Sequence, residues 1–246
     1  MMLAGLAVIY VAAAIWVRLR APVRVRNAAL TGMRVGTVVA AIAAVNHVVE
    51  MWISLPVWLG TLLGAGMWGV MFFAFGTACS LTYAREKSAG LGVLSSLACG
   101  ATLAALLVAF ALAIGFAFMA HMREVLAPLY AQSGMTDPDA FVVRHLLGAA
   151  REHLVIAPIV ATIVGSVSVV AVVLLESVER RTAVILTVAS VAVLAAGAAS
   201  LRFASSLERS ERPPFVMFGL VALCAALASA HPLLRALAPG ASRRTR

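Results

Sequence analysis

Apolar residues in this chain form long runs, separated by short stretches rich in arginine and other polar residues. Seven such runs cover residues 2–17, 35–55, 57–83, 91–120, 154–175, 182–201 and 215–234. Their lengths are close to the ~20 apolar residues that an α-helix needs to cross a bilayer. None has the short alternating pattern typical of a membrane β-strand. The pattern predicts an all-α, polytopic integral membrane bundle of about seven transmembrane helices.

Composition supports lipid as the surroundings of this bundle. The chain is 63% hydrophobic and only 12% charged, which is far from the composition of a soluble domain. We find no internal repeat and no soluble segment, so residues 1–246 are expected to form a single transmembrane domain. The first run has no basic leader before it and no small-residue cleavage site after it, so we expect it to be a helix that is kept.

The distribution of basic residues predicts an orientation. If the arginine-rich stretch 18–34 is cytoplasmic, the loops of a seven-helix chain place thirteen basic residues inside and six outside. The positive-inside rule then favours an external N-terminus and a cytoplasmic C-terminus. Usage rich in alanine and arginine and poor in lysine is typical of a high-GC bacterium, so the expected location is the bacterial inner membrane.

The outer segment 121–153 is expected to contain short helices. A first helix is predicted over 122–132. Thr136 and Asp139 have the spacing of a capping box, so a second helix should begin there and continue into the fifth run. Pro158 removes one backbone donor from that helix and predicts a local kink.

Small residues predict where helices pack closely in lipid. The sequence places Gly60 four residues before Gly64 and Gly100 four before Ala104, and a further small-residue run covers 195–199. We expect the helix backbones to approach one another at these positions.

The main functional candidates are histidines and glutamates that the predicted topology brings to the outer leaflet. Ionisable groups in or beside membrane helices are costly and often functional. Two His–Glu pairs have i, i+3 spacing, and a His–Glu pair seven apart shares one helix face. The candidate metal ligands are His47, Glu50, His121, Glu124, His145, Glu152 and His153.

Three hypotheses follow from these residues. Imidazoles and carboxylates on facing helices can hold a transition-metal ion, such as zinc, copper, iron or manganese, and two facing histidines can ligate a haem. Glu50 and His47 could instead serve a small transporter or proton channel. The third hypothesis is a non-catalytic subunit or sensor that acts through a homo-oligomer or another membrane protein. In that case His121, Glu124, His145 and Glu152 are solvated residues at helix ends, and Glu124 or Glu152 pairs with Arg123, Arg144 or Arg151.

Other classes are disfavoured by missing patterns. The arginines lie between apolar runs and are not interleaved with aromatic residues, so they are read as topology signals and lipid contacts, with no nucleic acid expected as a partner. The sequence has no phosphate-cradling glycine loop, no HExxH and no GxSxG. A hydrolase or nucleotide-driven pump is therefore disfavoured, and the function is not expected to be enzymatic.

Overall fold

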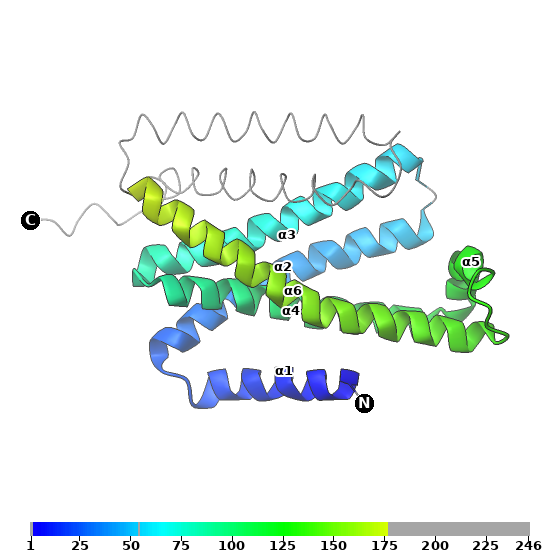
Figure 1. Cartoon of the computed structure of the whole chain (residues 1–246), viewed down its shortest axis with the longest axis horizontal. Helices are drawn as coiled ribbons and strands as arrows, with labels where there is room; N and C mark the ends of the chain where they lie inside the picture. The colour runs from blue at the N-terminus through cyan, green and yellow to red at the C-terminus, as the bar shows by residue number, and fades with distance from the viewer. Residues whose placement is uncertain (1, 54, 177–246) are drawn as a thin grey trace, which may run out of the picture.

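The computed structural model describes residues 2–53 and 55–176, and every regular element in this part of the chain is an α-helix. The all-helical class predicted from the apolar runs is confirmed for this part. The helices are α1 (Met2–Leu19), α2 (Val23–Trp52), α3 (Val57–Glu86), α4 (Ala89–Ala117), α5 (Met119–Tyr130) and α6 (Pro138–Glu176) (Figure 1).

Four stretches are long and apolar enough to cross a membrane, namely Val23–Trp52, Gly66–Glu86, Ala89–Ala117 and Pro138–Val173. The protein is therefore a multi-pass membrane protein in contact with the lipid bilayer. The first predicted span forms α1, a shorter apolar helix. The predicted spans 182–201 and 215–234 lie outside the described residues, so the count of seven stays a prediction.

The second span begins earlier than the apolar pattern predicted. α2 starts at Val23 and contains 30 residues, about 45 Å at 1.5 Å per residue. This length exceeds the ~30 Å hydrocarbon core of a bilayer. The arginine-rich stretch assigned to a loop is therefore partly helical, and Arg24, Arg26 and Arg34 lie on α2.

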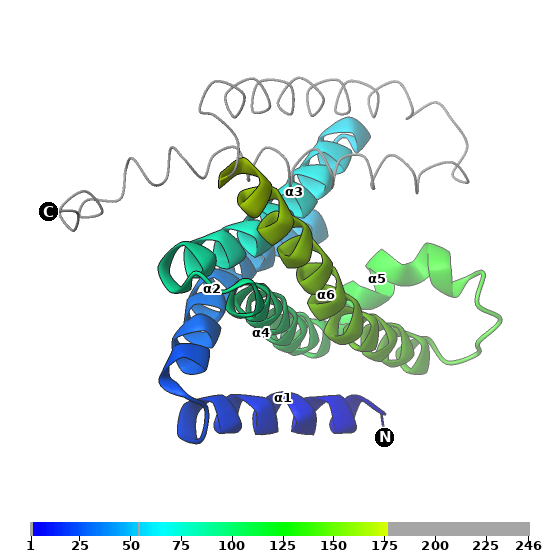
Figure 2. The ribbon, with the colours of Figure 1, turned by 60° about the vertical axis from the view of Figure 1, so that its left-hand side comes forward.

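α4 is the central helix of the bundle and packs against α2, α3 and α6. Figure 2 shows α4 between α2 and α6. Glycines allow this close approach, because a Cβ at Gly32 of α2 would collide with the carbonyl oxygen of Ser95 on α4. A Cβ at Gly36 would meet the carbonyl oxygen of Cys99, one turn along. Small residues thus bring the two backbones together, as expected for helices packed in lipid.

The structure tests some of the close helix contacts that the small residues predict. Gly100 of α4 lies against Ala161 and Ala157 of α6, so close packing there is confirmed. Close packing at Gly60 and Gly64 stays a prediction, because a Cβ at either would have no atom of the described residues within 4 Å. These two glycines lie in the first half of α3, where the described helices leave open space. The run 195–199 lies outside the described residues.

Polar side chains of three helices donate hydrogen bonds to backbone carbonyls of α6. The hydroxyl of Tyr10 on α1 donates to the carbonyl of Leu154 at 2.7 Å. The hydroxyl of Ser96 on α4 donates to Ala161, and the thiol of Cys79 on α3 donates to Gly165. The Leu154 carbonyl is available because Pro158, four residues later, has no N–H to donate. α6 changes direction along its length, as Figure 1 shows.

The antiparallel helices give the bundle two chemically different ends. The α1–α2 and α3–α4 turns meet at one end, which we call the basic end; its flanking residues include Arg18, Arg20, Arg24, Arg26, Arg85 and Lys87. The end of α2, the start of α3, α5 and the start of α6 meet at the other, which we call the histidine end (Figure 1).

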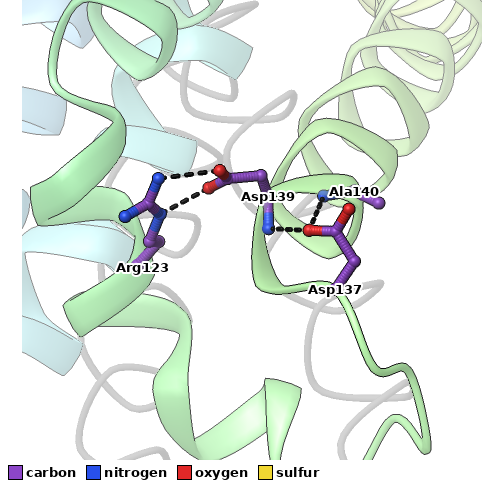
Figure 3. Close-up of polar contacts among 4 residues, drawn as sticks. All are labelled: Arg123, Asp137, Asp139 and Ala140. Atoms are coloured by element: carbon purple, nitrogen blue, oxygen red, sulfur yellow. Dashed lines mark hydrogen bonds and ion pairs between the residues drawn. The ribbon is translucent and has the colours of Figure 1, made fainter.

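At the histidine end, the segment 121–153 has the predicted two helices, but with a different cap. α5 ends at Tyr130, and Gly134 has a φ of 69° in the following turn. Asp137, and not Thr136, caps α6, because its Oδ1 accepts hydrogen bonds from the amides of Asp139 and Ala140 at 2.8 and 3.1 Å (Figure 3). The one-residue shift places Pro138 first in the helix, where its missing N–H is not needed.

Candidate functional site

Five helices enclose a cavity of about 420 Å³ at the histidine end. α2, α3, α4, α5 and α6 all contribute lining residues. Three of the five histidines of the chain line it, together with Glu50. The size is within the range of small-molecule sites in proteins. We call this space the histidine-end cavity.

The polar wall of the histidine-end cavity comes from α2 and α6. The carboxylate of Glu50 accepts a hydrogen bond from the Asn46 amide, one helical turn earlier, at 2.9 Å. His47 lies near Glu50 of its own helix and near His153 of α6. The exposed side chains of Glu50, His145 and His153 open the cavity to the surroundings of this end.

His153 has one ring nitrogen committed and one available. Its Nδ1 donates to the carbonyl oxygen of Ala149, on its own helix, at 2.8 Å. A neutral imidazole held in this way keeps its Nε2 as an acceptor for a ligand. His145 stacks on Phe141, with ring centroids 6.0 Å apart. The ring planes of both histidines are thus set by contacts within α6.

The rest of the cavity lining is mostly apolar and is rich in sulfur. Four of the ten methionines of the chain line the cavity, from α2, α3 and α5: Met51, Met67, Met71 and Met122. Trp68, which lies beside Phe72, adds an aromatic face. The sequence reasoning missed this wall, although Met67 and Met71 are four residues apart and therefore share a helix face.

His121 and Glu124 do not join this cavity, although the sequence grouped them with it. The Nε2 of His121 donates to the carbonyl oxygen of Met51 at 3.0 Å, close to the end of α2, where carbonyls lack helical donors. The ring stacks on Trp52 at 5.1 Å. Glu124 lies 3.8 Å from the other ring nitrogen and is exposed. His121 therefore ties α5 to the end of α2.

The remaining predicted residue, Glu152, is exposed and does not line the cavity. The alternative in which Arg123 pairs with Glu124 or Glu152 is wrong, since Arg123 instead forms a two-pronged ion pair with Asp139. Figure 3 shows this pair joining α5 to the start of α6. The hydrogen bonds that Arg123 donates to the Asp139 carboxylate raise the pKa of the exposed Arg123 guanidinium above its ordinary value.

The seven predicted ligands are therefore divided between the cavity and its surroundings. His47, Glu50, His145 and His153 line the cavity, while His121, Glu124 and Glu152 do not. Within residues 2–53 and 55–176, no three side chains of His, Cys, Asp or Glu are grouped closely enough to hold a metal ion. The cavity side chains would have to move together to form such a site.

The charge of the cavity is simple. Among its described lining residues, Glu50 is the only carboxylate, and none is lysine or arginine. The arrangement offers one carboxylate, imidazole and amide groups, and a large apolar wall. Such a wall and charge can hold a small cation that also has apolar surface.

Comparison of the chain with models of protein families, with curated proteins and with solved structures finds no match.

Proposed function

We propose that this protein is a small membrane transporter that binds an organic cation in the histidine-end cavity, with Glu50 as its counter-charge. The observation that carries the proposal is the pairing of one unopposed carboxylate with an apolar wall in a cavity of about 420 Å³. The chemical class is a quaternary or protonated amine with short apolar substituents. Catalysis is not part of the proposal.

The volume and the lining support an organic cation over a bare ion. A single metal ion needs ligand atoms about 2 Å away, so a cavity of this size would leave most of its wall unused. A quaternary ammonium gains from apolar contact and from the aromatic face of Trp68. The Glu50 carboxylate, at the open side of the cavity, attracts such a cation by its opposite charge.

The packing below the cavity supports a carrier over an open channel. Ala43 lines the cavity and also belongs to an apolar cluster with Val39, Phe72, Phe75 and Leu103. This cluster fills the described bundle between the cavity and the basic end. Passage would therefore require the helices to move, as in carriers whose site opens to one side at a time.

The topology is part of the same proposal. Among the described residues, seven basic side chains lie toward the basic end and three, Arg123, Arg144 and Arg151, lie at the histidine end beside the acidic Glu124, Asp137, Asp139 and Glu152. The positive-inside rule supports a cytoplasmic basic end and an external histidine end. We retain seven spans over one domain, an external N-terminus, a cytoplasmic C-terminus and the bacterial inner membrane as the expected arrangement.

The direct functional test is counterflow in proteoliposomes. Vesicles that contain the purified protein and unlabelled tetraethylammonium should accumulate external radiolabelled tetraethylammonium. Glu50→Gln should lose the accumulation, whereas Glu124→Gln, which removes an exposed carboxylate outside the cavity, should retain it. No accumulation with the wild-type protein, or equal accumulation with Glu50→Gln, would contradict the proposal and return attention to a non-transporting subunit or sensor.

The sulfur-rich wall favours a second candidate, a soft metal ion such as copper(I). Thioethers and imidazoles are ligands that copper(I) accepts. Methionine has three rotatable bonds, so its sulfur can swing toward an ion. The test is elemental analysis after exposure to silver(I), a copper(I) analogue. Stoichiometric silver that is lost in a Met67→Leu/Met71→Leu double variant would favour this candidate, and equal silver in both proteins would count against it.

A further inference from the structure

The basic end contains a second cavity, which is formed by α2 and α3 and is lined by both polar and apolar residues. Its volume is about 190 Å³, and its lining includes Asn27, Leu30, Arg34, Thr82 and Arg85. It lies at the opposite end of the bundle from the histidine-end cavity (Figure 1). We call it the basic-end cavity.

The one carboxylate in the lining of the basic-end cavity is already neutralised. Arg24 donates from its Nε to a carboxylate oxygen of Glu86 at 2.6 Å. Its Nη2 donates to the backbone carbonyl of the same residue at 2.8 Å, near the end of α3. Arg34 and Arg85 are exposed, and neither forms an ion pair with a described residue. Two positive charges therefore remain unopposed around this space.

A buried hydroxyl in the same lining lacks a partner. Thr82 is 2% exposed, and its Oγ1 has no hydrogen-bond partner among the described residues. Leaving a buried hydroxyl unpaired is costly, so such a group is expected to have a ligand or water in the working protein. Other threonines of the bundle, such as Thr31 and Thr162, donate to a carbonyl four residues earlier.

We propose that the basic-end cavity binds a phosphate group, with the guanidinium groups of Arg34 and Arg85 and the Thr82 hydroxyl as its donors. Guanidinium groups hold phosphate oxygens through charge-assisted, often two-pronged hydrogen bonds. Leu30, 39% exposed in the same lining, offers an apolar surface beside the charges. The phosphate can therefore belong to an anionic lipid headgroup or to a free phosphate.

The test uses the full-length protein in detergent and has two arms. The first measures by native mass spectrometry how phosphatidylglycerol binds. The second measures the thermal stabilisation that inorganic phosphate gives to lipid-free protein. An Arg34→Gln/Arg85→Gln variant should bind phosphatidylglycerol or inorganic phosphate, whichever the wild type binds, at least about tenfold more weakly. Each lost charge-assisted hydrogen bond is comparable to a tenfold change in affinity. A matched Arg18→Gln/Arg20→Gln variant changes the same charge outside the cavity and should bind normally.

The Thr82→Val variant leaves the net charge unchanged, so any effect that it has on binding cannot come from a general change in charge. It removes the unpaired hydroxyl while keeping the shape of the side chain, so the ligand-free protein should be at least as stable as wild type. Binding should nevertheless weaken severalfold. A loss confined to the lipid arm identifies a headgroup, and a loss in the phosphate arm identifies a free phosphate. Binding in neither arm, or an equal loss in the Arg18→Gln/Arg20→Gln control, would overturn the proposal.

Discussion

The hydroxyl of Tyr10 donates a hydrogen bond to the carbonyl of Leu154, 144 residues later in the chain, at 2.7 Å. That carbonyl is the one that Pro158 leaves without its helical donor. α1 is thereby fastened to α6 at the point where the helix ladder is interrupted. Beside this bond, Leu3, Leu6 and Tyr10 pack on a cluster that includes Leu154.

Tyr10→Phe should therefore lower the free energy of unfolding by about 1 kcal/mol, the usual net value of such a bond. In a Pro158→Ala background the new N–H can satisfy Leu154, so the same change should cost less. A double-mutant cycle by thermal unfolding in detergent measures the difference. Equal costs in the two backgrounds would contradict this relation between Tyr10 and Pro158.

Gly32→Ala should destabilise the bundle, because the added methyl group would collide with the Ser95 carbonyl of α4. Overpacking of this kind costs about 1–3 kcal/mol, more than the helix propensity that alanine gains over glycine. Gly90→Ala is the matched control, since a Cβ there has no described atom within 4 Å. Thermal unfolding should show a loss for the first variant and none for the second, and a reversed order would be inconsistent with the α2–α4 contact.

His121→Phe should separate a structural histidine from the cavity histidines. The variant keeps an aromatic ring beside Trp52 but loses the donor to Met51. We expect a loss of about 1 kcal/mol in stability with unchanged tetraethylammonium binding. Binding that fell as strongly as in Glu50→Gln would show that His121 belongs to the ligand site.

The proposed orientation predicts opposite accessibility for the two ends. The experiment uses a Cys224→Ala background, which removes the third cysteine of the chain. The two remaining native cysteines, Cys79 and Cys99, are buried and should not react with a membrane-impermeant maleimide. Gln132→Cys at the histidine end should be labelled in intact cells. Ala89→Cys at the basic end should be labelled only after the membrane is opened. Labelling in the reverse pattern would contradict the external histidine end.

Much of the helical fold can be predicted because the thickness of the lipid bilayer sets the length of the apolar run that each membrane-spanning helix needs. The apolar pattern does not predict the start of α2, because arginines also mark the ends of membrane spans, although a helix longer than the bilayer can carry Arg24 and Arg26 outside the hydrocarbon. The close contact of Gly32 is not predicted either, since Gly32 lies before the predicted span 35–55, whereas Gly36 lies inside that span. Their role depends on which face of α2 meets α4.

The candidate site was partly predictable. Spacing places His47 and Glu50 near each other on α2, and the predicted topology brings α6 histidines to the same end. Spacing cannot show that the break at Phe118 turns His121 toward the end of α2, or that Asp139 takes Arg123. The methionines that line the cavity come from α2, α3 and α5. Local sequence patterns do not show how these three helices pack, so they could not predict this part of the lining.

Equilibrium dialysis of radiolabelled tetraethylammonium against the detergent-purified protein tests the cation-binding claim most directly. Wild type and Glu124→Gln should bind it saturably with the same affinity, and Glu50→Gln should bind about tenfold more weakly, since the lost charge interaction corresponds to roughly 1.4 kcal/mol. Equal affinity in all three proteins, or no saturable binding by the wild type, would contradict a cation site at Glu50.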